Sequence, residues 1–334
     1  ATGTIINLLV GFFVGLSSGA TVVISQYFGS GDEDGVSRAV HTSIALSLAG
    51  GIFLTFVGIF GARWALEMMG TTADVIGGAT DYMRIYFAGV IMNLLYNMSS
   101  GILRAIGDSR TPLIFLIVCS LLNVALDLIF VINFKMEIAG VAIATIISQA
   151  VSAVLAIAYM LKKYAVLRFT AKHMRIDRGI LASVMRIGAP MAAQTLLITV
   201  GMMVTTSVIN SFGSGTVAAY TVGNKVEQLA TVLFSQVAFS FSVFAGQNFG
   251  ARKYDRIKDG MRKMLLLVVG LSAISTVVMF MFGRQIAWFF VEADTPASVI
   301  DSAYNMIRIE AALYSALGGI WVYNSALRGI GDAQ

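Results

Sequence analysis

The stretch LRAIGDSRTP runs from Leu103 to Pro112, and the chain ends on LRGIGDAQ, from Leu327 to Gln334. Five of the first six residues are identical in the two copies, which lie 224 positions apart. Two more sets of residues recur at separations of 224 and 221 positions. They are Ala79, Arg84 and Ile85 with Ala303, Arg308 and Ile309, and Val22, Gln26, Phe28 and Gly29 with Val243, Gln247, Phe249 and Gly250. The recurrence predicts a fold of two related halves, with a small insertion near Glu292–Pro296 in the second.

The composition places both halves in lipid rather than in water. Of the 334 residues, 57% are hydrophobic and only 12% are charged, and the mean hydropathy is +0.81. A soluble domain has about 25% charged residues. Cys119 is the only cysteine, and His41 and His173 are the only histidines. These counts exclude a disulfide within the chain and leave little for a zinc site.

Apolar windows predict nine membrane spans, and all are expected to be helices because lipid offers no hydrogen bonds to the backbone. The spans cover residues 5–26, 40–62, 83–103, 112–133, 138–161, 186–210, 218–246, 262–283 and 304–326. The fold class is therefore an all-α polytopic membrane protein.

The basic residues between the spans predict the orientation in the membrane. Loops on one side carry 17 Lys and Arg residues, those on the other side carry five, and Lys225 lies within a span. Cytoplasmic loops are enriched in Lys and Arg. We therefore expect the loops at 27–39, 104–111, 162–185 and 247–261 in the cytoplasm.

The repeat predicts three more helices than these nine. The span at 186–210 precedes the second-half helix that ends in QNFG, and no span precedes the corresponding helix of the first half. Two spans follow the motif LRAIGD in the first half, and none follows LRGIGD in the second. Filling both gaps gives twelve helices in two sixes, related by an axis along the membrane normal. We expect a fragment with an N-terminal lobe at 1–161 (helices 2–6), a cytoplasmic linker at 162–185 and a C-terminal lobe at 186–334 (helices 7–10).

Several longer motifs resemble those of one transporter family. They are GLSSGATVVISQYFGSGD (15–32), LRAIGDSRTP (103–112), NVALDLIFVINF (123–134), GVAIATIISQ (140–149) and MRIGAPMAAQ (185–194). In order and spacing they are similar to the prokaryotic multidrug and toxic-compound extrusion (MATE) family. The resemblance implies an antiporter in the prokaryotic inner or plasma membrane, without a cofactor, and the closed two-lobe arrangement would allow it to work as a monomer. It would export amphipathic or cationic organic compounds in exchange for H⁺ or Na⁺.

Asp127 is the strongest candidate for the coupling site, because an ionisable residue within a span is costly and often functional. Asn123 lies four residues earlier on the same helix face. Thr145, in the next span, has a similar depth. Their oxygens suit Na⁺, and the carboxyl alternatively suits a proton. The resemblance implies the same role, with a further acid in the first helix; the alternative is a structural role for Asp127.

A second family branch has a Glu eight residues after the proline of its seventh helix. The corresponding position after Pro190 is Ile198. This departure favours the DinF-like branch, whose ion site lies in the first lobe.

The substrate cavity has weaker candidates. Glu227 and Lys225 lie within the span 218–246 on different helix faces, and Glu227 either holds a cationic substrate or forms a structural ion pair. Aromatic rings attract organic cations. The polar and aromatic candidates are Tyr86, Asn93, Tyr96 and Asn97 in one half and Trp321, Tyr323 and Asn324 in the other. The alternative for each is a bridge between helices or a place at the membrane interface.

Three other functions are less well supported. GLSSG at 15–19 matches the G-x-S-x-G pattern of hydrolases, but it falls within a predicted membrane helix, where that chemistry does not occur. The basic linker fits the inner membrane surface better than nucleic acid. A flippase for lipid-linked oligosaccharides, from the same superfamily, would need cations deep in the spans, where Lys225 stands alone.

Overall fold

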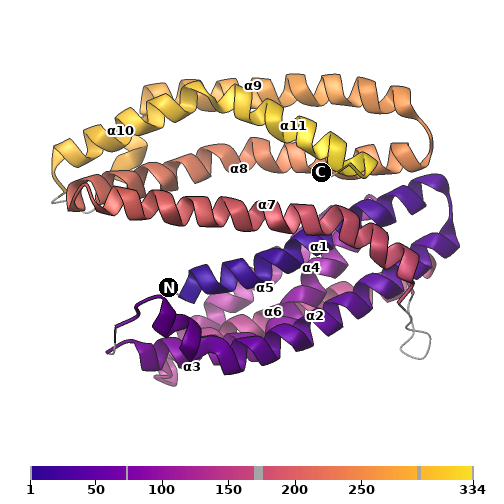
Figure 1. Cartoon of the computed structure of the whole chain (residues 1–334), viewed down its shortest axis with the longest axis horizontal. Helices are drawn as coiled ribbons and strands as arrows, with labels where there is room; N and C mark the ends of the chain where they lie inside the picture. Colours follow the sequence, from indigo (N-terminus) through magenta and orange to yellow (C-terminus); the bar gives the residue numbers. More distant parts are fainter. Residues whose placement is uncertain (1, 73, 169–175, 292–294, 333–334) are drawn as a thin grey trace. The chain divides into compact units, whose positions relative to one another are not determined.

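The computed structural model describes residues 2–72, 74–168, 176–291 and 295–332, and within them every regular element is helical (Figure 1). The first half contains α1 (Thr2–Ser30), α2 (Glu33–Met68), α3 (Ile76–Ala88), α4 (Val90–Ala105), α5 (Arg110–Leu128), a π-helical turn η1 (Ile129–Asn133), α6 (Glu137–Lys163) and a 3₁₀ turn η2 (Ala165–Leu167). The second half contains α7 (Arg178–Asn210), α8 (Ser214–Gly250), α9 (Tyr254–Trp288), α10 (Ala297–Ala312) and α11 (Tyr314–Ile330).

The helices confirm most of the predicted spans. Within the described residues, seven helices are long and apolar enough to cross a membrane. The pair α3–α4, bent by 48°, makes an eighth span if the two helices are counted as one. The ninth predicted span, 304–326, falls on α10 and α11, which have 16 and 17 residues and are separately too short to cross. This ninth span stays a prediction.

The breaks within the two pairs, α3–α4 and α10–α11, are themselves part of the repeat. The first break is at Gly89 and the second at Leu313, again 224 positions apart. At each break the backbone N–H donates to the carbonyl three residues earlier, from Gly89 N to Tyr86 O at 3.1 Å and from Leu313 N to Glu310 O at 2.9 Å. Neither position is a proline, the usual cause of a kink, so the sequence did not predict either break.

Several predicted cytoplasmic loops are shorter than expected, because the helices continue beyond the apolar windows. Of the predicted loop at 27–39, only Gly31 and Asp32 are not helical. Asp32 caps α2, since its Oδ1 accepts a hydrogen bond from Gly35 N at 2.8 Å. The predicted loop at 247–261 shrinks to 251–253. Hydropathy detects the membrane-embedded part of a helix but not its polar ends.

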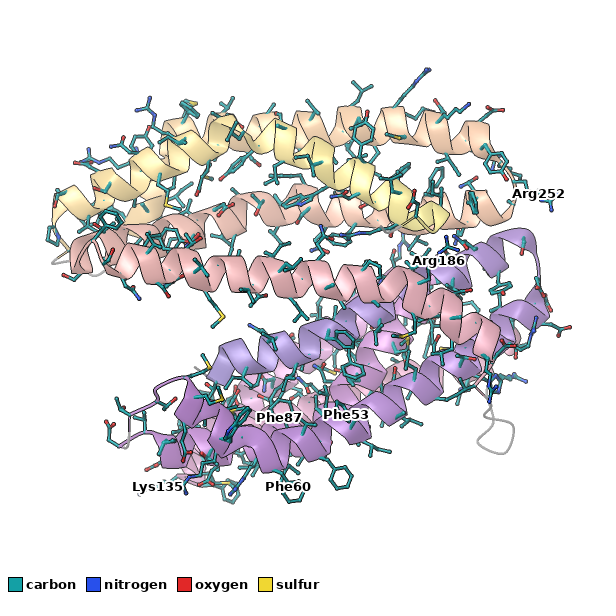
Figure 2. The ribbon with its side chains drawn as sticks, viewed as in Figure 1. Phe53, Phe60, Phe87, Lys135, Arg186 and Arg252 are labelled. Atoms are coloured by element: carbon teal, nitrogen blue, oxygen red, sulfur yellow. The ribbon has the colours of Figure 1, made fainter. Side chains whose placement is uncertain are left out.

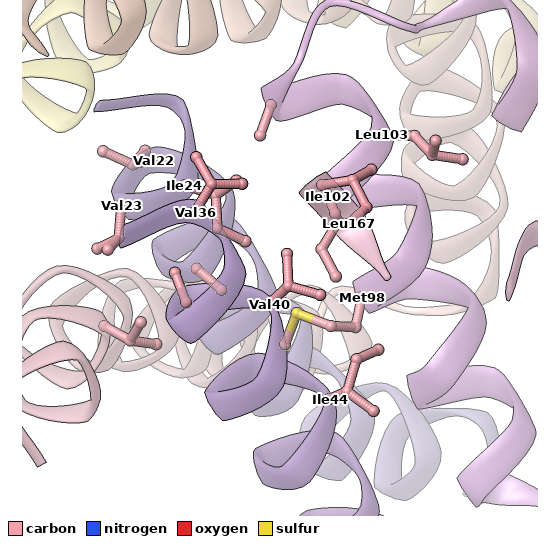
Figure 3. Packing of buried hydrophobic residues seen from close by; sticks show 14 of the residues in the cluster. Val22, Val23, Ile24, Val36, Val40, Ile44, Met98, Ile102, Leu103 and Leu167 are labelled. Carbon is pink, nitrogen blue, oxygen red and sulfur yellow. The ribbon is translucent and has the colours of Figure 1, made fainter. Parts of the chain in front are cut away.

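The chain divides into two compact units, unit 1 up to Leu196 and unit 2 from Leu197 to Asp332. Figure 3 shows the core of unit 1, where Val40 and Ile44 of α2 meet Met98 of α4. In unit 2, α8, α9 and α11 pack against one another and enclose Phe234 and Phe241. The predicted lobe boundaries stay a prediction; α7 begins in unit 1 and ends in unit 2.

The outer surface of the helices is apolar, as a lipid-facing surface should be. Phe53, Phe60 and Trp64 lie exposed along α2, and Phe60, at 76% exposure, projects from the ribbon in Figure 2. More than half of the side chains of α5 are also exposed, and most of these exposed side chains are apolar. A water-soluble protein rarely exposes so continuous an apolar surface. The chain is a multi-pass membrane protein.

Candidate ion and substrate sites

Asp127 and Asn123 lie on one face of α5, one turn apart. Asp127 Oδ1 and Asn123 Nδ2 are both buried and have no hydrogen-bond partner among the residues that the structure describes. A buried polar atom without a partner costs about 1–3 kcal/mol. An unpaired acceptor and an unpaired donor on one helix face are the groups that a polar ligand would bind.

Thr145 lies on α6, which packs against α5. Its hydroxyl donates to Val141 O at 2.9 Å, so its own oxygen keeps lone pairs for another partner. The same pair of neighbouring helices therefore carries all three predicted coupling residues, and their role stays a prediction.

The chain directly after Asp127 forms the π-helical turn η1, which the sequence did not predict. The Phe134 N–H donates to Ile129 O at 3.2 Å, five residues back. Such turns are rare and often lie at functional sites. After it, Lys135 and Glu137 have positive φ values of 53° and 46°, which are uncommon for residues other than glycine.

A second acidic site lies in unit 2, where the sequence indicated only Glu227. Glu227 of α8 is close enough to Glu310 of α10 for their charges to interact, and Tyr314 of α11 is close to both. Glu310 Oε2 and the Tyr314 hydroxyl are buried, and neither has a hydrogen-bond partner in the described part of the chain. Glu310 lies within the predicted span 304–326, so the cost of an ionisable residue in lipid would have identified it.

The other predicted cavity residues fall in both units. In unit 1, the Tyr96 hydroxyl donates to Pro112 O at 3.0 Å, and Asn97 Nδ2 donates to Asn93 Oδ1 at 3.0 Å. In unit 2, Lys225 and Tyr323 are exposed and Asn324 is half-buried. The Tyr96 bond joins α4 to α5, as the alternative interpretation expects, whereas the Asn97 bond lies within α4. A substrate cavity lined by these candidates stays a prediction.

Asp108, in the repeated IGD motif, organises the end of unit 1 that is predicted to be cytoplasmic. Its carboxylate accepts hydrogen bonds from Thr111 N at 3.1 Å and Thr111 Oγ1 at 2.9 Å. It also accepts from the Tyr164 hydroxyl at 2.9 Å and the Tyr159 hydroxyl at 3.3 Å. Lys163 Nζ lies 4.0 Å away. Asp108 therefore joins the start of α5 to the end of α6 and the first residue after it.

We expect the stabilising effect of Asp108 to depend on pH. Burial opposes ionisation, but the hydrogen bonds from Thr111, Tyr164 and Tyr159 outweigh it, and the pKa of Asp108 lies below its ordinary value. The ionised form is favoured in the folded state, so its contribution is present above the unfolded pKa of about 3.9 and disappears as pH falls. Asp108→Asn should lower the midpoint of thermal unfolding at pH 7, and the difference from wild type should shrink near pH 3.5. An equal difference at both pH values would contradict this.

The comparisons with known proteins agree with this architecture. The family model MatE matches residues 1–129 and 190–334. Because this is more than half of the chain, the protein belongs to the MATE family, a family of membrane transporters and not of enzymes.

Individual relatives are distant but cover nearly the whole chain. The probable multidrug resistance protein YoeA of Bacillus subtilis is 27% identical over 97% of this chain and 71% of its own length. The multidrug export protein MepA of Staphylococcus saprophyticus is 21% identical over 95% of this chain and 69% of its own length. A crystal structure of MATE in the bent conformation superposes with a TM-score of 0.92 at 21% identity, covering 98% of this chain and 72% of that one. At that identity the likeness concerns the fold alone.

Proposed function

We propose that the protein is a secondary antiporter that exports amphipathic organic cations in exchange for Na⁺ or H⁺. The observation that carries the proposal is the unpaired, buried face of Asp127 and Asn123. A cation or a proton bound there would satisfy Asp127 Oδ1 and so remove the unfavourable free energy of leaving that oxygen unpaired. The printed names of the relatives YoeA and MepA, which concern multidrug resistance and export, support the direction and class of substrate.

In this mechanism the ion binds at Asp127 from outside, because Asp127 is about six residues from the predicted outer end of its span. The added charge changes the packing of α5 and α6, which lowers the affinity for substrate on the outer side. Release of the ion to the cytoplasm restores the affinity. Each turn of the cycle thus exchanges one class of cation for another.

The acids of unit 2 would hold the positive group of the substrate. Glu227 and Glu310 lie in two different predicted spans, and their neighbouring carboxylates repel each other unless a cation or proton is present. Tyr314 adds an aromatic ring beside them, which also attracts organic cations.

The experiment that tests the function is export of a fluorescent lipophilic cation. The full-length gene product that contains this chain is expressed in a bacterial host that lacks its own efflux pumps. We expect dye export that stops when the Na⁺ and proton gradients are both collapsed. Export of a lipid-linked oligosaccharide in reconstituted vesicles, without export of the dye, would favour the flippase instead.

Glu310→Gln is expected to weaken binding of a cationic substrate about tenfold, equivalent to about 1.4 kcal/mol. It removes one carboxylate charge, and the apparent KM for dye should rise while the dependence on the ion gradient remains. The matched control is Asp301→Asn on the same helix, because that exposed carboxylate pairs with Arg284 at 2.9 Å. Equal KM values for the two variants would remove Glu310 from the substrate site.

A further inference from the structure

We propose that a basic pocket between α8 and α9 binds the headgroup of an anionic membrane phospholipid at the predicted cytoplasmic end of unit 2. The pocket has a volume of about 450 Å³. Its lining combines aromatic and aliphatic side chains of both helices with two cations of α9, Arg256 and Lys263. The two helices are joined by the short turn at 251–253, where Arg252 is labelled in Figure 2. Such a site goes beyond export, because it requires only a membrane and the predicted orientation of unit 2.

The cations of the pocket lie on one face of α9. Arg256 and Lys263 are seven residues apart, which is close to two full turns of a helix. Lys263 Nζ pairs with Asp259 Oδ2 at 2.8 Å, so these two charges offset each other. Arg256 has no ion pair among the residues that the structure describes. The lining therefore keeps one uncompensated positive charge, at Arg256, for an anionic ligand.

The apolar part of the pocket continues onto the lipid-facing surface. The rings of Phe241 and Phe244 stack with their centroids 5.6 Å apart. Phe241 is buried, whereas Phe244 and Leu267 are 40% and 51% exposed. Since Arg256 and Lys263 precede Leu267 along α9, the cations lie toward the polar end of the helix. Basic pockets between membrane helices on the cytoplasmic side bind anionic lipid headgroups, and the exposed apolar side chains would contact the acyl chains.

The internal repeat shows which part of the pocket belongs to unit 2 alone. Helices α2 and α9 begin 221 positions apart, the separation at which the preceding helices also correspond. At this separation Arg256 corresponds to Gly35, and Lys263 corresponds to Thr42. Neither cation has a basic counterpart in unit 1. The two cations are therefore particular to unit 2 and not a general consequence of the repeat.

In unit 1 the chain itself covers the position that corresponds to Lys263. The N–H of Asp177 donates to Thr42 Oγ1 at 3.0 Å, and Thr42 is fully buried. Lys263 has only hydrogen-bond donors, so it cannot accept from a backbone N–H as Thr42 does. A covering segment like that of unit 1 would therefore not pair with it. Phosphate oxygens accept hydrogen bonds from both Lys and Arg, so an anionic lipid suits the pocket better.

Lipid binding to the purified full-length protein tests the proposal. Phosphatidylglycerol and phosphatidylcholine with the same acyl chains are added separately to delipidated protein in detergent, and bound lipid is measured by native mass spectrometry. We expect about fivefold tighter binding of phosphatidylglycerol, the effect of one net cation near a membrane surface. The double variant Arg256→Gln with Lys263→Gln should lose this preference. Equal binding of the two lipids by wild type would overturn the proposal.

The matched control is Lys258→Gln with Arg262→Gln, which removes two exposed cations from the same turns of α9. At 100° per residue they lie about 200° and about 240° around the helix from Arg256, on the opposite face. This variant should keep the preference for phosphatidylglycerol. Equal loss of the preference in both double variants would show a general effect of basic charge and would also overturn the site.

A photoreactive residue identifies the occupant of the pocket directly. The full-length protein with p-benzoylphenylalanine in place of Leu267 is illuminated in bacterial membranes. We expect an adduct with the mass of one anionic phospholipid. An adduct with a zwitterionic lipid, or a crosslink to a peptide of the same chain, would contradict the proposal. None of these measurements requires transport, so they decide about the pocket even if the protein exports no dye.

Discussion

Asp127→Asn is expected to reduce ion-driven export of a lipophilic cation at least tenfold, to near the level of cells without the protein. Asparagine has nearly the shape of aspartate but can neither take up a proton nor offer a negative charge to Na⁺. The loss should therefore appear in coupling and not in folding. The measurement is dye efflux at equal membrane expression, under a proton gradient and under a Na⁺ gradient separately.

The matched control is Asp81→Asn, which removes an exposed carboxylate from α3 and should leave export unchanged. If Asp127→Asn exports as well as wild type, Asp127 has a structural role and the coupling ion must bind elsewhere. The acids of unit 2, Glu227 and Glu310, would then be tested next by replacing both with Gln. Loss of export under only one of the two gradients would identify the coupling ion.

Gly188→Ile is expected to destabilise the protein by about 3 kcal/mol or more and to reduce the yield of folded protein strongly. A Cβ at Gly188 would lie 2.9 Å from the Cα of Leu16 and 3.2 Å from Gly15 O, so the clash is with backbone, which cannot move aside as a side chain can. Overpacking of a well-packed site typically costs about 1–3 kcal/mol. The measurement is the midpoint of thermal unfolding in detergent, followed by size-exclusion chromatography.

Gly61→Ile on α2 is the control, because nothing lies within 4 Å of a Cβ added there. It makes the same change within a membrane helix and should leave the midpoint nearly unchanged. If Gly188→Ile is as stable as this control, α7 does not pack on α1 as described.

Much of the fold could be predicted from the sequence, because lipid leaves few choices to the backbone. The low share of charged residues predicts helices, and the separation of 224 positions between the two IGD motifs predicts two related halves. The structure shows the same separation, because the helix breaks at Gly89 and Leu313 are also 224 positions apart. The place of Asp127 on α5, next to the helix that carries Thr145, also agrees with the sequence pattern.

Other features depend on contacts between residues that are distant in the sequence. Glu310 is one isolated acid in the sequence, and only the packing of α10 against α8 brings it near Glu227. The tyrosines that bind Asp108 lie about 50 residues after it, and no local pattern connects them.

Hydropathy and residue identity are properties of single residues and short segments, so the sequence was enough to predict a membrane environment, a helical fold and the internal repeat. The packing of distant segments was needed to find which buried polar atoms have no partner among the described residues. The close approach of Gly15 and Gly19 of α1 to Gly188 and Ala192 of α7 is likewise visible only in the folded chain. Such packing depends on the shapes of two helices together, and neither helix contains that information alone.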